Sequence, residues 1–242
     1  MKYSQSNETI QIFESEDWKE KYRKLSLCTI DIIKRKLSKQ GVTTLILDED
    51  LKLYYRKLVM YFSGDPRFQD FSITTKTGKK IPYQLRKSLL IIGDCGRSKT
   101  FMMEHVMNEF CNRFYPQNSY RCYNSFDIVK DFSENSLKAT KQFEKSRKSV
   151  GDFDDTRFFN IYIDEVGAET KTLNNFGTKL TPITTVLYER YNVWKTFETK
   201  THISTNLTIA EFGTIYDKRI QDRLYEMFNI IHVPGESIRS LI

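Results

Sequence analysis

The chain has 242 residues, of which 39% are apolar and 14% aromatic, and it carries a formal net charge of +7. This length allows one sizeable α/β domain with a small appendage and excludes two large domains. With 29% charged residues and only 10 Gly and 5 Pro, it is not a low-complexity chain. The positive surplus is compatible with nucleic acid, an acidic protein or a membrane surface, and also with charges spread over solvated helix faces.

The cysteine spacing and the hydropathy of the chain argue against a zinc protein, a membrane protein and a secreted protein. The four cysteines show no CxxC pairing and no His at metal-ligand spacing, which argues against zinc. No apolar run approaches the ~20 residues that span a bilayer. The polar, acidic start lacks the apolar region of a signal peptide. We therefore expect a cytoplasmic protein without a membrane partner.

Residues 1–80 are predicted to form a small helical N-terminal region that binds a partner. Apolar side chains recur at helical intervals over residues 18–39, opposite a basic face, and again over residues 48–62. The sequence Ser63-Gly64-Asp65-Pro66 ends the second helix, because Gly and Pro do not readily continue one. The polar stretch 74–80 predicts a hairpin or loop.

Residues 81–242 alternate between strand and helix patterns and are predicted to form the catalytic core. Short apolar runs predict strands at 88–92, 120–123, 158–163, 200–205 and 229–233. Helical spacing predicts helices at 98–114, 126–132, 137–150, 185–194 and 217–227. Five strands separated by helices predict a three-layer α/β sandwich with a mainly parallel five-stranded sheet.

The strongest motif follows the first core strand and opens a helix. It reads Gly93-Asp94-Cys95-Gly96-Arg97-Ser98-Lys99-Thr100. A triphosphate needs several converging backbone N–H donors, which a Gly-rich turn at a helix N-terminus supplies. In this P-loop pattern Lys99 reaches the β- and γ-phosphates of ATP, and the Thr100 hydroxyl coordinates Mg²⁺. Ser98 stands where the last Gly is expected, and its Cβ can crowd the phosphates or the loop, so tight ATP binding stays open.

The second motif is an apolar strand that ends in Asp164-Glu165. Ligands of open α/β sheets bind at the carboxyl ends of the strands. We expect Asp164 to hold Mg²⁺ and Glu165 to orient or activate the attacking water as a general base. Alone, this pattern is common at solvated strand ends. Its position after a phosphate loop favours the catalytic interpretation.

At these motifs the chain resembles the DnaC/IstB branch of the AAA+ ATPases, the helicase-loader family. The run from Ile163 to Glu169 resembles that family's extended Walker B motif, and Ile203-Ser204-Thr205-Asn206-Leu207 resembles its sensor I strand. The resemblance implies that Asn206 contacts the γ-phosphate or its water. It covers roughly residues 87–239, and residues 1–80 match only loosely.

Three arginines acquire roles from the same resemblance. The segment 216–224 resembles the family's arginine-finger helix, which implies that Arg223 is the finger and Arg219 a supporting arginine. A finger from a neighbouring subunit stabilises charge on the transferring phosphoryl group. For both arginines a solvated helix face is the ordinary alternative. The segment 235–239 resembles the family's closing segment and implies Arg239 as a sensor II arginine that binds nucleotide. We also expect an AAA+ core without a C-terminal lid.

The function implied is that of an ATPase acting on DNA as a homo-oligomer formed on ATP or DNA. The leading hypothesis is a helicase loader that binds a replicative helicase and single-stranded DNA. The alternatives are an IstB-like transposition regulator that binds duplex DNA and a transposase, or a nucleotide-gated binding module with little hydrolysis because of Ser98. Lys138, Lys141, Lys145 and Lys148 share one side of the predicted helix 137–150, where they could follow a phosphate backbone or simply be solvated.

Overall fold

The computed structural model describes residues 17–42, 47–75, 77–135, 139, 143, 146–150, 153–157, 159–169, 172–175 and 178–238. Its centre is a sheet of five parallel strands in the order β11-β3-β10-β7-β4. The strands are β3 (Ser88–Ile92), β4 (Tyr120–Asn124), β7 (Asn160–Val166), β10 (Thr201–Thr205) and β11 (Phe228–His232). The predicted parallel sheet is confirmed. β3 and β10 are buried along their whole length, as central strands covered on both faces should be.

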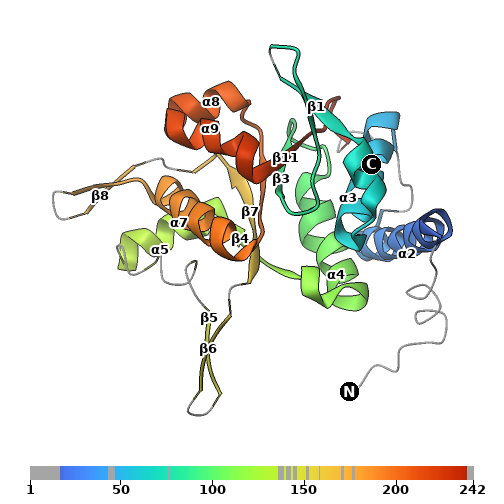
Figure 1. Cartoon of the computed structure of the whole chain (residues 1–242), viewed down its shortest axis with the longest axis horizontal. Helices are drawn as coiled ribbons and strands as arrows, with labels where there is room; N and C mark the ends of the chain where they lie inside the picture. Colours follow the sequence, from blue (N-terminus) through green and yellow to red (C-terminus); the bar gives the residue numbers. More distant parts are fainter. Residues whose placement is uncertain are drawn as a thin grey trace.

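Helices cover both faces of this sheet (Figure 1). On one side lie α2 (Trp18–Lys39), α3 (Glu49–Ser63) and the helix that follows β3, which consists of η2 (Phe101–Met107) and α4 (Asn108–Phe114). On the other side lie α5 (Ser125–Asn135), α7 (Pro182–Phe197), α8 (Ile209–Ile215) and α9 (Lys218–Met227). Each side has its own cluster of buried apolar side chains. The three-layer sandwich therefore follows the prediction.

The helix after the phosphate loop departs from regular α geometry. Residues Phe101–Met107 are wound as a π-helix, and the amide of Asn108 donates to the carbonyl of Met103, five residues earlier. Such wide turns in helices are rare and are often found at functional sites. The apolar spacing predicted a helix here but not its wider turn.

The N-terminal helices belong to the same packed body as the sheet. Side chains of α2 and α3, such as Leu25, Ile32 and Leu58, share one buried cluster with Leu89 and Ile91 of β3. The N-caps Asp17 and Asp48 accept backbone N–H groups at the starts of α2 and α3, and Gly64 ends α3 in a left-handed conformation (φ 72°). The predicted helices and their stop are thus confirmed.

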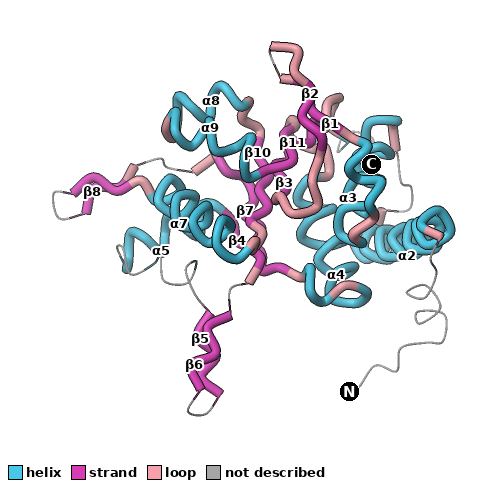
Figure 2. Tube along the Cα trace, viewed as in Figure 1, coloured by secondary structure: helices cyan, strands magenta, loops and turns pink. Residues whose placement is uncertain are grey.

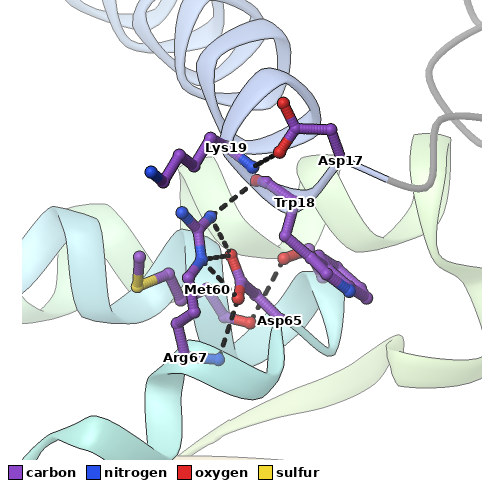
Figure 3. A network of polar contacts seen from close by, with 7 residues as sticks. Asp17, Trp18, Lys19, Met60, Asp65 and Arg67 are labelled. Carbon is purple, nitrogen blue, oxygen red and sulfur yellow. Dashed lines mark hydrogen bonds and ion pairs between the residues drawn. The ribbon is translucent and has the colours of Figure 1, made fainter.

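A polar network joins the start of α2 to the end of α3 (Figure 3). The Arg67 guanidinium pairs with the buried Asp65 carboxylate at 2.5 Å and donates to the Trp18 carbonyl at 2.6 Å. The Asp65 amide in turn donates to the Met60 carbonyl at 2.9 Å. Arg67 lies in the short 3₁₀ helix η1 (Pro66–Asp70). Beyond it, β1 (Ser72–Thr74) and β2 (Lys80–Pro82) form an antiparallel hairpin, as the polar stretch predicted.

The helix predicted over residues 137–150 is wrong in its last part. Residues Ser146–Val150 form strand β5, which pairs antiparallel with β6 (Phe153–Arg157). Val150 and Phe153 are register partners across two residues, Gly151-Asp152, a sequence that suits a two-residue hairpin. Lys148 therefore lies in a strand, while Lys138, Lys141 and Lys145 lie outside the described residues. A continuous helical lysine stripe does not form.

Two hairpins extend away from the sandwich in Figure 2, and neither was predicted. One is β5–β6. The other pairs β8 (Leu173–Asn175) with β9 (Thr178–Leu180) between β7 and α7. Also unpredicted are η3 (Pro116–Asn118) and α8, which begins with a reciprocal capping box between Thr208 and Glu211. Among the described helices, none is both long and apolar enough to cross a membrane.

Candidate functional site

A cavity of about 390 Å³ brings most of the predicted site residues together. It lies against the phosphate loop and the carboxyl ends of β7 and β10, where ligands of parallel α/β sheets bind. It is lined by Leu37, Gln40, Tyr55, Cys95, Gly96, Arg97, Ser98, Lys99, Thr100, Phe101, His105, Asp164, Glu165, Thr205, Asn206 and Ile238. The motifs recognised along the sequence thus meet in one hollow.

The phosphate loop is shaped by close contacts with the segment that follows β11. A Cβ at Gly93 would lie 2.5 Å from the Val233 carbonyl oxygen, so only glycine fits there. Gly96 has a left-handed backbone (φ 79°), and a Cβ there would overlap Ser237. The Ile238 amide donates to the Gly96 carbonyl at 3.2 Å. The predicted closing segment therefore packs directly on the loop, while Arg239 lies outside the described residues.

Lys99 is the buried cation of the loop. Its ammonium donates to the carbonyls of Gly93 and Asp94, at 2.5 and 2.8 Å, and to the Asn206 Oδ1 at 2.8 Å. Burial lowers the pKa of Lys99, and the nearby Cys95, Asp164, Asp94 and Glu165 oppose that shift. These contacts place the ammonium between the loop and the end of β10. An incoming phosphate would take the place of the carbonyl partners.

Asp164 and Thr100, the two residues expected to hold a metal ion, are in direct contact. The Thr100 hydroxyl donates to Asp164 Oδ2 at 2.8 Å. The other carboxylate oxygen accepts from the Tyr162 hydroxyl at 2.5 Å and from the Ser204 hydroxyl. The carboxylate is buried, yet every donor to it is a neutral hydroxyl. Carboxylate and hydroxyl oxygens are ligands that Mg²⁺ prefers, so these residues fit a magnesium ion.

Tyr162 and Ser204 were missed by sequence reasoning, although a signal was present. Side chains two residues apart on a strand lie on the same face. Tyr162 therefore shares a face with Asp164 on β7, and Ser204 comes from the neighbouring strand β10. Burial, and then Asp164, raises the pKa of Tyr162 well above its ordinary value, so the phenol stays a donor.

Glu165 leaves the sheet at a β-bulge. The β7–β10 register shifts between the pairs Ile203–Ile163 and Thr205–Val166, so Asp164 and Glu165 together face Ser204. Glu165 has a left-handed backbone (φ 56°), and its carbonyl accepts from the Ser125 hydroxyl at 3.0 Å. The bulge turns the Glu165 side chain out of the strand alternation and leaves it exposed at the cavity. That is where a general base for water has to stand.

Asn206 lies directly after β10 and contacts the phosphate loop twice. Its Oδ1 accepts from Lys99, and its Nδ2 lies 3.2 Å from the Cys95 sulfur. Its exposed side chain lines the cavity. These contacts place the Asn206 amide beside Lys99 at the phosphate loop.

Arg97 differs from the other loop residues because its guanidinium is held by the start of α3 and by the segment after β11. It pairs with the Asp48 carboxylate through two bonds, of 2.6 and 3.0 Å, and donates to the Glu236 carbonyl at 3.1 Å. Its side chain is 1% exposed. Arg97 is one of the loop residues expected to bind nucleotide. In this structure its guanidinium joins the phosphate loop to the start of α3.

The wall nearest α2 and α3 was also not predicted. Leu37, Gln40 and Tyr55 line the cavity from the N-terminal region, and Phe101 and His105 line it from η2. The two rings of η2 lie edge to face with centroids 6.2 Å apart. The loose match of residues 1–80 gave no signal for such contacts between distant segments.

The two arginines of α9 lie away from this cavity. The Arg223 guanidinium stacks on the rings of Tyr188 and Tyr191, 4.7 and 4.3 Å from their centroids. Arg219 is exposed one helical turn earlier. The loop after β7 contacts the end of α8, just before α9, through Glu169, which accepts from the Gly167 amide at 2.7 Å and the Tyr216 hydroxyl at 2.6 Å.

Comparison with known proteins identifies the fold. No family model matches the chain, and no curated protein matches it. Among solved structures, the DnaC helicase loader has a TM-score of 0.51 and 12% identity, over 79% of this chain and 94% of that chain. DnaI has a TM-score of 0.50 and 13% identity, over 80% and 87%. The chain has an AAA+ P-loop fold.

A DnaA from Aquifex aeolicus bound to AMPPCP also matches, with a TM-score of 0.47 and 12% identity over 81% of this chain and 50% of that chain. The resemblance noted in the motifs agrees with the DnaC helicase loader and DnaI at the level of the fold.

Proposed function

We propose that the chain binds ATP with Mg²⁺ in this cavity and hydrolyses it as one subunit of a homo-oligomer. The observation that carries the proposal is the Thr100–Asp164 pair beside the buried Lys99. A buried ammonium next to a hydroxyl–carboxylate pair is the arrangement that a magnesium–triphosphate complex requires. Glu165 and Asn206, both at the cavity, would orient the attacking water and contact the γ-phosphate.

The magnesium ion would be held by Thr100 and Asp164, and it would neutralise charge on the β- and γ-phosphates. The chain's own residues would do the rest. Backbone N–H groups from Asp94 to Lys99 would bind phosphate oxygens, and the Lys99 ammonium would exchange its carbonyl partners for phosphate oxygens. Arg223 and Arg239 are assigned by resemblance as finger and sensor II arginine. Arg223 would have to leave its tyrosine partners and reach a neighbouring subunit's site.

As its role, we propose helicase loading, in which residues 1–80 bind a replicative helicase and the assembly binds single-stranded DNA. The fold shared with the DnaC helicase loader and DnaI supports this choice. Positive charge is concentrated there: residues 1–80 hold 16 Lys and Arg against 11 Asp and Glu. An IstB-like regulator that binds duplex DNA and a transposase is the alternative.

A nucleotide-gated binding module with little hydrolysis is the third possibility, because Ser98 replaces the usual glycine. Turnover decides between this module and an ATPase. We expect purified protein to hydrolyse ATP in the presence of Mg²⁺ and single-stranded DNA, and Glu165→Gln to abolish most of that turnover while nucleotide still binds. Binding without turnover in the unchanged protein would favour the module.

The partner is tested by purification from the native cell with a tag at the C-terminus. Recovery of a replicative helicase supports helicase loading, and recovery of a transposase supports the IstB-like alternative. The same experiment with residues 1–80 changed at exposed basic positions of α2, such as Arg23 and Lys34, tests whether this region makes the contact. Loss of the partner from that variant is the expected result.

A further inference from the structure

The phosphate loop contains a serine in a conformation that favours glycine. Ser98 has φ 58°, in the left-handed region. For a residue with a Cβ this conformation is disfavoured by on the order of tenfold relative to ordinary backbone. Such a conformation persists only where the surrounding structure fixes it. Something near Ser98 must therefore supply that constraint.

The residue after Ser98 is held from one side. The Lys99 ammonium makes bonds of 2.5 to 2.8 Å to Gly93, Asp94 and Asn206. The Ser98 carbonyl itself accepts from the Met102 amide at 2.9 Å, which fixes the start of the helix. These contacts are expected of any such loop, because the lysine and the helix belong to the motif. They do not distinguish a serine from a glycine at position 98.

The residue before Ser98 is held from the other side, by a contact that the P-loop pattern does not include. Arg97 pairs with Asp48 through two bonds, of 2.6 and 3.0 Å, in the fork geometry that fixes a guanidinium most firmly. Its side chain is 1% exposed. Gly235 makes room for it, since a Cβ there would lie 2.9 Å from Arg97 Cζ. Arg97 is thus enclosed between the start of α3 and the segment after β11.

α3 contacts the loop at a second point. Tyr55 lines the cavity next to Ser98 and is buried. Its hydroxyl makes no hydrogen bond of ordinary geometry to a described residue. The Ser98 hydroxyl nevertheless opposes part of the rise in the Tyr55 pKa that burial causes. Tyr55 and Ser98 thus line the same cavity, and the start of α3 supplies the ion-pair partner of Arg97.

We infer that the Asp48–Arg97 ion pair is a positioning device that holds Ser98 in the left-handed conformation, so that the N-terminal helices set the shape of the phosphate loop. The inference rests on the proposed nucleotide site. It explains how the loop keeps its shape without the glycine of the motif. It also gives a partner bound to α2 and α3 a direct route to the phosphates.

A double-mutant cycle tests this role. Asp48→Asn removes the charge but keeps an N-cap for α3, because Asn caps helices as well as Asp. Arg97→Met removes the guanidinium and keeps much of the packing of the side chain. The Asp48 carboxylate that loses its partner is 46% exposed, so water can solvate it. Each is combined with Ser98→Gly. Affinity is measured with a fluorescent ATP analogue and Mg²⁺.

We expect Arg97→Met to weaken binding on the order of tenfold, and Asp48→Asn somewhat less, since glycine alone adopts this conformation at no cost. In the Ser98→Gly background the same changes should weaken binding less than about threefold. Rescue by glycine is the decisive result, because an ion pair that merely stabilises the fold would not be rescued at position 98. Equal losses in both backgrounds, or no loss at all, would overturn the inference.

Arg35→Ala is the matched control. Arg35 pairs with Glu109 at 2.5 Å, so it also joins an N-terminal helix to the core, but through α4 and not through the loop. Its loss should leave affinity unchanged in both backgrounds. A glycine-dependent effect of Arg35→Ala would show that any link to the N-terminal helices acts in this way, and would contradict the specific role of Asp48.

A second measurement needs no nucleotide and separates this inference from the proposed function. If the ion pair holds Ser98 under strain, Ser98→Gly should raise the denaturant midpoint of the free protein. In the Arg97→Met background the loop can relax, and the same change should give no rise. An identical shift in both backgrounds refutes the positioning role. The cycle therefore gives a result even if the unchanged protein binds no nucleotide.

Discussion

The burial of His202 predicts a measurable dependence of protein stability on pH. It lies on the central strand β10, 1% exposed, among the rings of Tyr61, Phe62 and Tyr120. Its Nδ1 accepts from the Leu89 amide at 3.2 Å, so a neutral ring carries its proton on Nε2. Burial, with Lys200 and Arg190 nearby, lowers the pKa of His202 from 6.5 to about 3.

The direction of the pH effect follows from that pKa. Between pH 6.5 and about 3 the unfolded chain binds a proton at His202 that the folded chain does not, so stability falls as the pH falls through this range. At pH 5 the unfolded pKa lies about 1.5 units above the solution pH, which corresponds to about 2 kcal/mol of lost stability. At pH 7.5 the loss is close to zero.

His202→Asn removes the titration and keeps an acceptor for the Leu89 amide. Free energies of unfolding are measured by denaturant titration at pH 7.5 and pH 5 for both proteins. The unchanged protein should lose about 2 kcal/mol more than the variant over this interval, because all other titrating groups are common to both. An equal loss in the two proteins would refute a buried, neutral His202.

The remaining predictions concern the site. Glu165→Gln should retain nucleotide, measured by equilibrium binding, while the rate of hydrolysis falls by at least about a hundredfold, as expected for loss of a general base; unchanged turnover would give Glu165 a structural role. Arg223→Ala should leave nucleotide binding intact and abolish hydrolysis, and mixing it with Lys99→Ala should restore part of the ATPase activity. Mixed assemblies that form without any gain in ATPase activity would contradict a finger that acts in a neighbouring subunit. For single-stranded DNA, the logarithm of the binding constant should fall linearly with the logarithm of salt concentration, with a slope of about −0.7 per phosphate contact. Replacing Arg23 and Lys34 with Glu should make this slope shallower. A slope that the double replacement leaves unchanged would move the DNA contact elsewhere.

Much of the fold could be predicted because its signals are local. Apolar runs such as Leu89–Ile92 mark buried strands wherever they occur, and the phosphate loop and Asp164-Glu165 carry their chemistry in adjacent residues. The order of the motifs along the chain then placed the site at one edge of the sheet. The cavity confirms that these residues meet.

The failures have physical causes of two kinds. Lysines spaced at three and four residues indicate a helix, yet Ser146–Val150 pairs with Phe153–Arg157 as antiparallel strands. Pairing between strands overrode the local pattern. Other features depend on partners far away in the chain. The Asp48–Arg97 pair joins residues 49 positions apart, and no local sequence pattern around either residue predicts this ion pair. Ser98 was visible as a departure from the motif, but the contact that supports it was not.

The central claim is that Lys99, Thr100 and Asp164 form a site for magnesium and a triphosphate. Its most direct test is an equilibrium titration of the unchanged protein and of Lys99→Ala with a fluorescent ATP analogue, with and without Mg²⁺. The unchanged protein should bind in a magnesium-dependent way, and Lys99→Ala should not. Equal binding by both proteins would contradict a magnesium–triphosphate site at these residues. So would a failure of both the unchanged protein and Ser98→Gly to bind at millimolar nucleotide.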